Sequence, residues 1–162
     1  MSTFRSPTPR QLAFGLTVLR VIIGVTFIMH GGQKLFVYGF DGVSGAFAQM
    51  GIPLPNIMGP FIGFVEFLGG IALVLGLLTR VAALGLAANM LVAILTVHVK
   101  DGFFNPTGVE FPLSLLGAAM MLAIVGAGEF SIDAMIAKWP VRAPAQPFAF
   151  NASSGESSRR AA

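Results

Sequence analysis

The sequence has no cysteine and few charged residues. Without cysteine, this chain cannot form disulfides, perform thiol redox chemistry or supply thiolate ligands to a metal or an iron–sulfur cluster. Charged residues make up 10% of the 162 residues, whereas soluble domains carry about 25%. Hydrophobic residues make up 55%, and the mean hydropathy is +0.81. These values exclude a soluble domain and predict one integral membrane domain in a lipid bilayer.

The sequence also lacks a Lys/Arg-rich run with interleaved aromatic residues, so no nucleic-acid partner is expected. The net charge of +3 is instead typical of loop charges that set the orientation of membrane helices. If the N-terminus is cytoplasmic, the outer face holds only Lys34 and Lys100. The inner face then holds Arg5, Arg10, Arg80, Lys138, Arg142, Arg159 and Arg160. The positive-inside rule therefore predicts that both termini are cytoplasmic.

Four apolar stretches are each close to the roughly 20 residues that a membrane crossing needs. The predicted spans are residues 12–30, 57–78, 81–99 and 111–127, followed by a short interfacial helix at 132–139 that Ser131 caps. Another short interfacial helix is expected at 43–50. Residues 1–11 are expected to be flexible, and the Pro-, Ala- and Ser-rich residues 140–162 to be disordered. The sequence thus predicts an all-α, integral membrane four-helix bundle, multi-pass in the bacterial cytoplasmic membrane.

Three of the predicted spans carry a strongly polar residue at the same depth. From the helical rise, Arg20 lies about 15 Å from Arg10, Asn89 about 14 Å from Arg80, and Glu66 about 15 Å into the second span from its outer end. Each of the three lies on a helical stripe with small residues, which let the helices approach closely. The stripes are Arg20, Gly24, Phe27, Gly31 and Lys34; Gly59, Gly63, Glu66, Gly70 and Leu73; and Ala82, Gly85, Asn89, Ala93 and Thr96. Because an unpaired charge at this depth is costly, we predict that Arg20 pairs with Glu66, with Asn89 beside them. Two roles are open for this group: an ion pair that locks the bundle, or a proton relay.

A second group of polar residues is predicted near the outer ends of the spans. His30, Lys34 and His98 lie there among several phenylalanines. Cationic donors, imidazoles and aromatic walls would suit a quinone headgroup, so these residues form a candidate headgroup pocket. The alternative is an ordinary interfacial belt of aromatic residues and lysine, which needs no ligand. No metal site is predicted, because a third ligand is missing, and no covalently bound cofactor is expected.

Several short segments give the chain a resemblance to a known family. They are Leu19-Arg20, residues 30–35 (HGGQKL), 66–70 (EFLGG), 76–80 (GLLTR), His98, 102–104 (GFF) and 126–133 (GAGEFSID). In order and spacing, the chain resembles the DoxX family of small bacterial and archaeal membrane proteins over about residues 12–135. The resemblance implies four membrane spans and an association with redox chemistry. Founding members are similar to subunits of a thiosulfate:quinone oxidoreductase, and relatives are often described as oxidoreductases.

The combined prediction is a membrane subunit of a redox system that contacts quinone. Because the chain has no cysteine and no cofactor motif, we expect it not to catalyse an oxidation alone but to act with soluble or membrane redox subunits. The alternative is a non-enzymatic protein, either a membrane scaffold or a small-molecule permeation protein, since ionisable groups inside a membrane also line substrate pathways.

Overall fold

The computed structural model describes residues 6–138, and all regular secondary structure in that range is helical. Four longer helices form the bundle: α1 (Pro9–Gly32), α3 (Pro55–Leu75), α4 (Thr79–Ala93) and α5 (Glu110–Val125). Two short helices, α2 (Gly39–Gln49) and α6 (Ile132–Ala137), lie outside it. The predicted all-α fold is confirmed. The predicted disorder of residues 140–162 lies outside the described residues.

Two of the helices continue beyond their regular α-helical part. A π-helical turn, η1 (Gln33–Val37), follows α1, and another, η2 (Ile94–His98), follows α4 and leads into the 3₁₀ turn η3 (Val99–Asp101). With these extensions, Pro9–Val37, Pro55–Leu75 and Thr79–Asp101 are long and apolar enough to cross a membrane, and α5 is a shorter apolar helix. The first helix thus extends seven residues past His30, where the sequence analysis ended the first span.

Local sequence signals explain where several helices begin and end. Thr8 caps α1 in a reciprocal arrangement with Gln11, and Pro9 occupies the first turn, where a missing N–H does no harm. Gly76 ends α3 in the left-handed conformation (φ +66°) that glycine adopts without strain. The predicted cap of α6 is confirmed, because the Ser131 hydroxyl accepts a hydrogen bond from Ala134 N at 3.1 Å.

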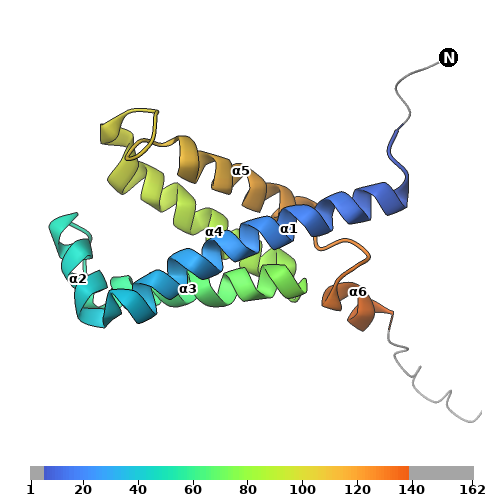
Figure 1. Ribbon diagram of the computed structural model, residues 1–162, viewed down its shortest axis with the longest axis horizontal. Coiled ribbons are helices and arrows are strands. Elements are labelled where there is room, and N and C mark those ends of the chain that lie inside the picture. Colours follow the sequence, from blue (N-terminus) through green and yellow to red (C-terminus); the bar gives the residue numbers. More distant parts are fainter. Residues whose placement is uncertain (1–5, 139–162) are drawn as a thin grey trace, which may run out of the picture.

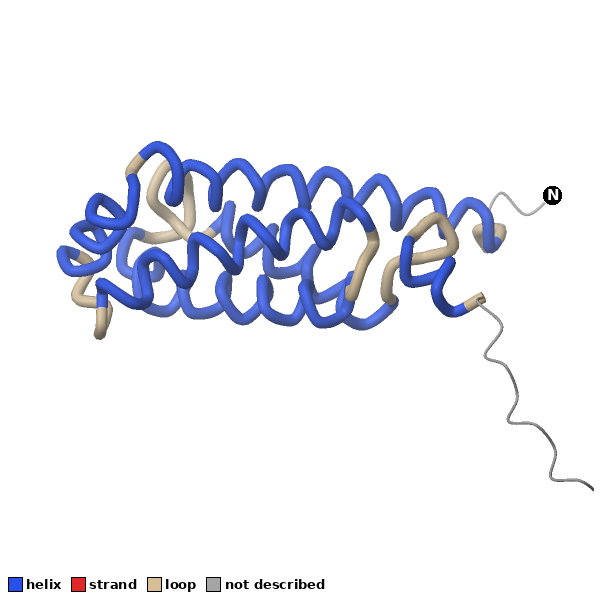
Figure 2. Tube along the Cα trace, turned by 90° about the horizontal axis from the view of Figure 1, so that it is seen from below, coloured by secondary structure: helices blue, strands red, loops and turns tan. Residues whose placement is uncertain are grey.

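The helices are arranged as two antiparallel pairs, α1 with α3 and α4 with α5 (Figure 1). The start of α1 and the helix α6 lie at one end of the bundle, which we call the α6 end (Figure 2). At the opposite end, the α2 end, the two pairs diverge and α2 packs against α3. Both described ends of the chain therefore lie on the same side of the bundle. Which side faces the cytoplasm stays a prediction.

Close glycine contacts fix how α1 sits on α3. A Cβ added at Gly24 would lie 2.7 Å from the carbonyl oxygen of Gly70, and one added at Gly70 would lie 2.6 Å from the carbonyl oxygen of Gly24. A second close contact joins Gly31, seven residues after Gly24 in α1, to Gly63, seven residues before Gly70 in α3: a Cβ on Gly31 would lie 2.7 Å from the Gly63 carbonyl oxygen. The backbones therefore touch at two levels, and a one-residue slip would place side chains where there is no room.

Candidate functional site

Arg20 is buried near the α6 end, where its guanidinium donates to backbone carbonyl groups. Only 3% of the residue is exposed. Its Nη1 donates to the carbonyl oxygens of Leu73 (3.3 Å) and Val74 (3.1 Å), and its Nη2 donates to that of Phe130. The last carbonyls of a helix have no partner within the helix, and they carry partial negative charge. Arg20 therefore binds the C-terminus of α3, and the predicted Arg20–Glu66 pair is wrong.

The error has a geometric cause. The Gly24–Gly70 contact sets the register of α1 on α3. Arg20, one turn before Gly24 in α1, therefore lies beside Val74, one turn after Gly70 in α3. Glu66 lies two turns along α3 from that point. In addition, helical side chains lean toward the N-terminus of their own helix, so on antiparallel helices Arg20 and Glu66 lean away from each other. The prediction compared only the depths of the Cα atoms, so it took neither the register between the helices nor the direction of the side chains into account.

Asp133 extends the contacts at the α6 end. Its carboxylate accepts hydrogen bonds from the backbone N–H groups of Leu78 (2.7 Å) and Thr79 (2.9 Å), where α4 begins. Burial alone would raise the pKa of Asp133, but these hydrogen bonds, with a smaller contribution from the charge of Arg20, hold the pKa below its ordinary value. The α6 segment is thereby tied both to the end of α3 and to the start of α4.

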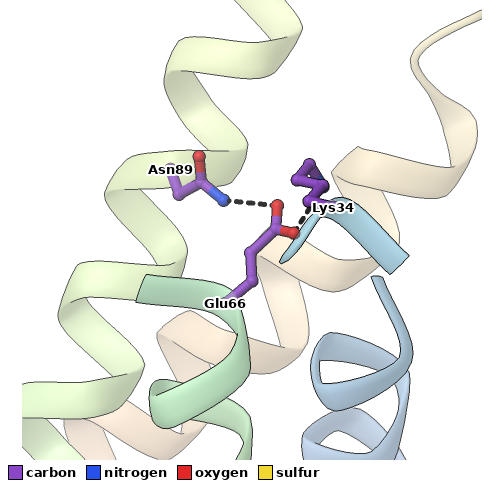
Figure 3. Close-up of polar contacts among 3 residues, drawn as sticks. All are labelled: Lys34, Glu66 and Asn89. Carbon is purple, nitrogen blue, oxygen red and sulfur yellow. Dashed lines mark hydrogen bonds and ion pairs between the residues drawn. The ribbon is translucent and has the colours of Figure 1, made fainter. Parts of the chain in front are cut away.

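Glu66 is buried at the opposite part of the α1–α3 contact, and its partners are Lys34 and Asn89 (Figure 3). One carboxylate oxygen, Oε2, forms an ion pair with Lys34 Nζ, and the other, Oε1, accepts a hydrogen bond from Asn89 Nδ2 at 2.9 Å. Here the leaning of side chains brings the partners together, because Lys34 and Glu66 lean toward each other. The predicted meeting of Glu66 with Asn89 therefore holds, whereas the cation beside them is Lys34.

This cluster lines a cavity of about 460 Å³ between the two helix pairs at the α2 end. His30 and His98 line the same cavity, so the structure brings together all three residues of the candidate headgroup pocket. Its walls are mainly apolar and aromatic, and they include side chains that the sequence analysis did not assign to the pocket. These are chiefly Phe27, Phe47, Met90, Phe111 and Leu115. Phe27 could have been found from the sequence, because it lies on the same stripe of α1 as Arg20 and Gly24.

The two histidines of the cavity lining are less buried than Glu66, since His30 is exposed and His98 is half-buried. The ring of His30 packs against Phe111 of α5, with centroids 5.7 Å apart. His98 Nδ1 lies 2.6 Å from the carbonyl oxygen of Thr107. Because a carbonyl only accepts, Nδ1 carries the proton, and Nε2 of the neutral ring is left as an acceptor. His98 and Lys34 both belong to π-helical turns, which are rare and occur often at functional sites.

The cavity can hold and orient a small ligand. Cavities of roughly 300–1,000 Å³ with apolar walls and a few placed polar groups are typical ligand sites. Lys34 supplies N–H donors, Glu66 can exchange a proton, and Asn89 offers both a donor and an acceptor. Within residues 6–138, no group of three or more histidine, aspartate or glutamate side chains is placed to hold a metal ion. The arrangement thus favours a neutral organic ligand.

Comparison with known proteins agrees with this architecture. The chain is 32% identical over 130 residues to "Putative oxidoreductase CatD" of Bacillus subtilis, covering 80% of this chain and 92% of that protein. It is 32% identical over 126 residues to the inner membrane protein YqjF of Escherichia coli, covering 76% of this chain and 93% of that protein.

A third relative is an uncharacterized membrane protein of Mycobacterium tuberculosis, Rv3486, 32% identical over 131 residues, with 74% and 80% of the two chains covered. No solved structure matches the chain significantly. The DoxX family model matches residues 15–99, a segment that includes Lys34, Glu66, Asn89 and both histidines. The chain belongs to the DoxX family.

Proposed function

We propose that this protein is an inner-membrane subunit of a redox system and that its cavity binds the headgroup of a quinone. The redox assignment is supported by the relative that bears an oxidoreductase name, and the location by the relative named as an inner membrane protein. A quinone dissolves in the same lipid phase that the bundle occupies. It would supply two-electron redox chemistry, and soluble or membrane partner subunits would supply or accept the electrons.

One observation carries the proposal: the buried Glu66 and the half-buried Lys34 form a hydrogen-bonded pair that faces an apolar cavity. A pair that served only to lock helices would be expected to pack against side chains on all sides. Here Lys34 keeps 22% of its side chain exposed, while Glu66 keeps 5%. Lys34 is therefore available to donate to a ring carbonyl, and Glu66 is held where it can take up or release a proton.

The residues also fit the size and chemistry of a quinone ring. Aromatic and aliphatic side chains such as Phe27, Met90 and Leu115 would enclose the ring, and the polar groups lie at one wall. His30, packed on Phe111, and His98 would contact the opposite side of the headgroup. In this proposal the chain binds and orients the ring and moves protons at Glu66.

The first test is direct binding. We expect quinone to co-purify with the protein and ubiquinone-1 to bind to the apo-protein in lipid nanodiscs. Replacing Lys34 with Met should weaken binding by about tenfold, the usual effect of losing one charge-assisted hydrogen bond. His30→Ala should weaken it less, because His30 lines the cavity without contacting the ion pair.

The matched control is Lys100→Met, which removes an exposed lysine that does not line the cavity. This variant should bind ubiquinone-1 as the wild type does. If neither extraction nor titration detects quinone, or if Lys34→Met binds it unchanged, the proposal is wrong. A non-enzymatic scaffold or a permeation protein would then be the better reading of the cavity.

A further inference from the structure

The polar wall of the cavity presents a hydrogen-bond donor, Lys34, and a hydrogen-bond acceptor, Asn89, on either side of the Glu66 carboxylate. Asn89 uses Nδ2 to donate to Glu66, which turns its oxygen Oδ1 away from the carboxylate (Figure 3). Within residues 6–138, the buried side-chain polar atoms without a partner are Arg20 Nε and Thr79 Oγ1. Asn89 Oδ1 also receives no hydrogen bond within these residues, but it is not one of these fully buried atoms. The oxygen is therefore accessible, and we infer that it opens to the cavity that Asn89 lines.

The donor on this wall is Lys34. An ammonium group has three N–H donors, and Glu66 takes one of them, which leaves two for a ligand. The charges of Lys34 and Glu66 cancel, so the wall is neutral overall and favours a neutral ligand over an anion or a cation. A ligand group that both donates and accepts at one oxygen atom would satisfy Asn89 and Lys34 together. A hydroxyl group does this, and a carbonyl group cannot donate.

We propose that the cavity binds the reduced, hydroxyl-bearing form of its ring ligand more tightly than the oxidised, carbonyl form, and that Asn89 sets this preference. The inference rests on the proposed function. The quinol hydroxyl donates to Asn89 Oδ1, and its oxygen accepts from Lys34 Nζ. The quinone carbonyl accepts from Lys34 but leaves Asn89 Oδ1 buried under the ring without a donor, which is unfavourable.

The size of the preference follows from that one hydrogen bond. Leaving a buried acceptor unpaired should weaken binding of the quinone about tenfold relative to the quinol. Quinone becomes quinol by taking up two electrons and two protons. Tighter binding of the quinol by tenfold therefore raises the reduction potential of the bound couple by about 30 mV relative to the couple in the membrane.

The test compares three ligands on the full-length protein in nanodiscs under argon. They are ubiquinone-1, its quinol, and the dimethyl ether of that quinol, whose oxygens accept but cannot donate. The wild type should bind the quinol about tenfold more tightly than the other two. Asn89→Leu, which is close in size, should bind all three alike, whereas Thr96→Val should keep the preference. Thr96 also lines the cavity, but its hydroxyl donates to its own helix at Val92 (2.8 Å).

The outcomes separate this inference from the function on which it rests. If the wild type binds quinone and quinol equally, the preference is wrong while the quinone site stands. The same conclusion follows if the dimethyl ether binds as tightly as the quinol. If none of the three ligands binds, the proposed function fails and the inference fails with it. The ligand series on the wild type decides the preference itself, whether or not Asn89→Leu folds. If Asn89→Leu folds and still binds the quinol more tightly, the assignment to Asn89 is wrong.

Discussion

The helix α1 and its extension η1 carry two cations, the buried Arg20 and the half-buried Lys34, and the two ends of the bundle satisfy them differently. At the α6 end, Arg20 donates to backbone carbonyls, which are neutral and do not titrate. At the α2 end, Lys34 pairs with a carboxylate that faces a cavity. The difference teaches that a cation within an apolar helix need not mark a reactive site. What matters is whether its partner can exchange a proton and whether a ligand can reach it.

The strongest test of this contrast removes the cation at the α6 end. Arg20→Leu leaves the part-buried carbonyls of Val74 and Phe130 without these donors, at about 1–3 kcal/mol for each unsatisfied group, whereas the Leu73 carbonyl still accepts from Gly76 N. We expect the free energy of unfolding to fall by about 3 kcal/mol or more, measured by denaturation in detergent micelles. Arg20→Lys should recover part of the loss, because an ammonium can still donate there. Unchanged stability of Arg20→Leu would remove the structural role.

A smaller effect is expected at the α2 end. Glu66→Leu leaves the Lys34 ammonium without its partner, but Lys34 is partly exposed to the cavity and can be hydrated there. We expect a loss of about 1–2 kcal/mol, less than for a sealed charge. Adding Lys34→Met to Glu66→Leu should restore much of it, and a double-mutant cycle in the same micelles measures the coupling. If Glu66→Leu destabilises more than Arg20→Leu, the contrast between the two ends is wrong.

The smallest effect should come from Asp133, and it should depend on pH. Removing its cap on α4 by Asp133→Ala should destabilise the protein by about 1 kcal/mol at neutral pH. Because the folded protein holds the pKa below its ordinary value of 3.8, the stabilisation is complete above that value and is lost as the pH falls through the folded-state pKa. Melting temperatures of the two proteins should therefore differ at pH 6, and the difference should shrink as the pH falls below 3.8. A difference that does not shrink as the pH falls would contradict the assigned role of the carboxylate.

Much of the fold and part of the site were predictable from helical periodicity. On α3, the stripe predicted around Glu66 is the buried face, since Gly59, Gly63, Gly70 and Leu73 are all buried with it. On α1, Arg20, Gly24, Phe27 and Gly31 are buried in the same way. Small residues at helical spacing give a strong signal, because a face that must approach another backbone tolerates little else.

The pairing of the charges was harder to predict, since it depends on register between helices. A useful signal was present: Gly24 and Gly31 are seven residues apart, as are Gly63 and Gly70. Matching the two pairs in antiparallel order places Arg20 near the end of α3 rather than at Glu66.

The stripe predicted around Asn89 also fails in part. Gly85 and Thr96 are exposed, and Asn89 is instead buried beside Leu86 and Met90. The buried face of α4 mixes large and small side chains, Leu86 and Met90 with Ala83 and Ala87, so small residues alone did not mark it. The π-helical turns that carry Lys34 and His98 left no sequence signal that we can identify.

The backbone contact between α1 and α3 has a mechanical consequence. Because these helices touch at two levels, they can move only as one rigid arm, and α4 with α5 forms the other. The arms are tied at the α6 end by Arg20, which donates to the carbonyl of Phe130 beyond α5, and by the N–H of Asp133, which donates to the carbonyl of Gly76 at the end of α3. The width of the cavity is then governed by the angle between the arms. Over a helix of 21 residues, which spans roughly 30 Å, opening the angle by about two degrees shifts the far end by about 1 Å. A ligand could thus be admitted or released by a rotation too small to disturb the packing of either arm.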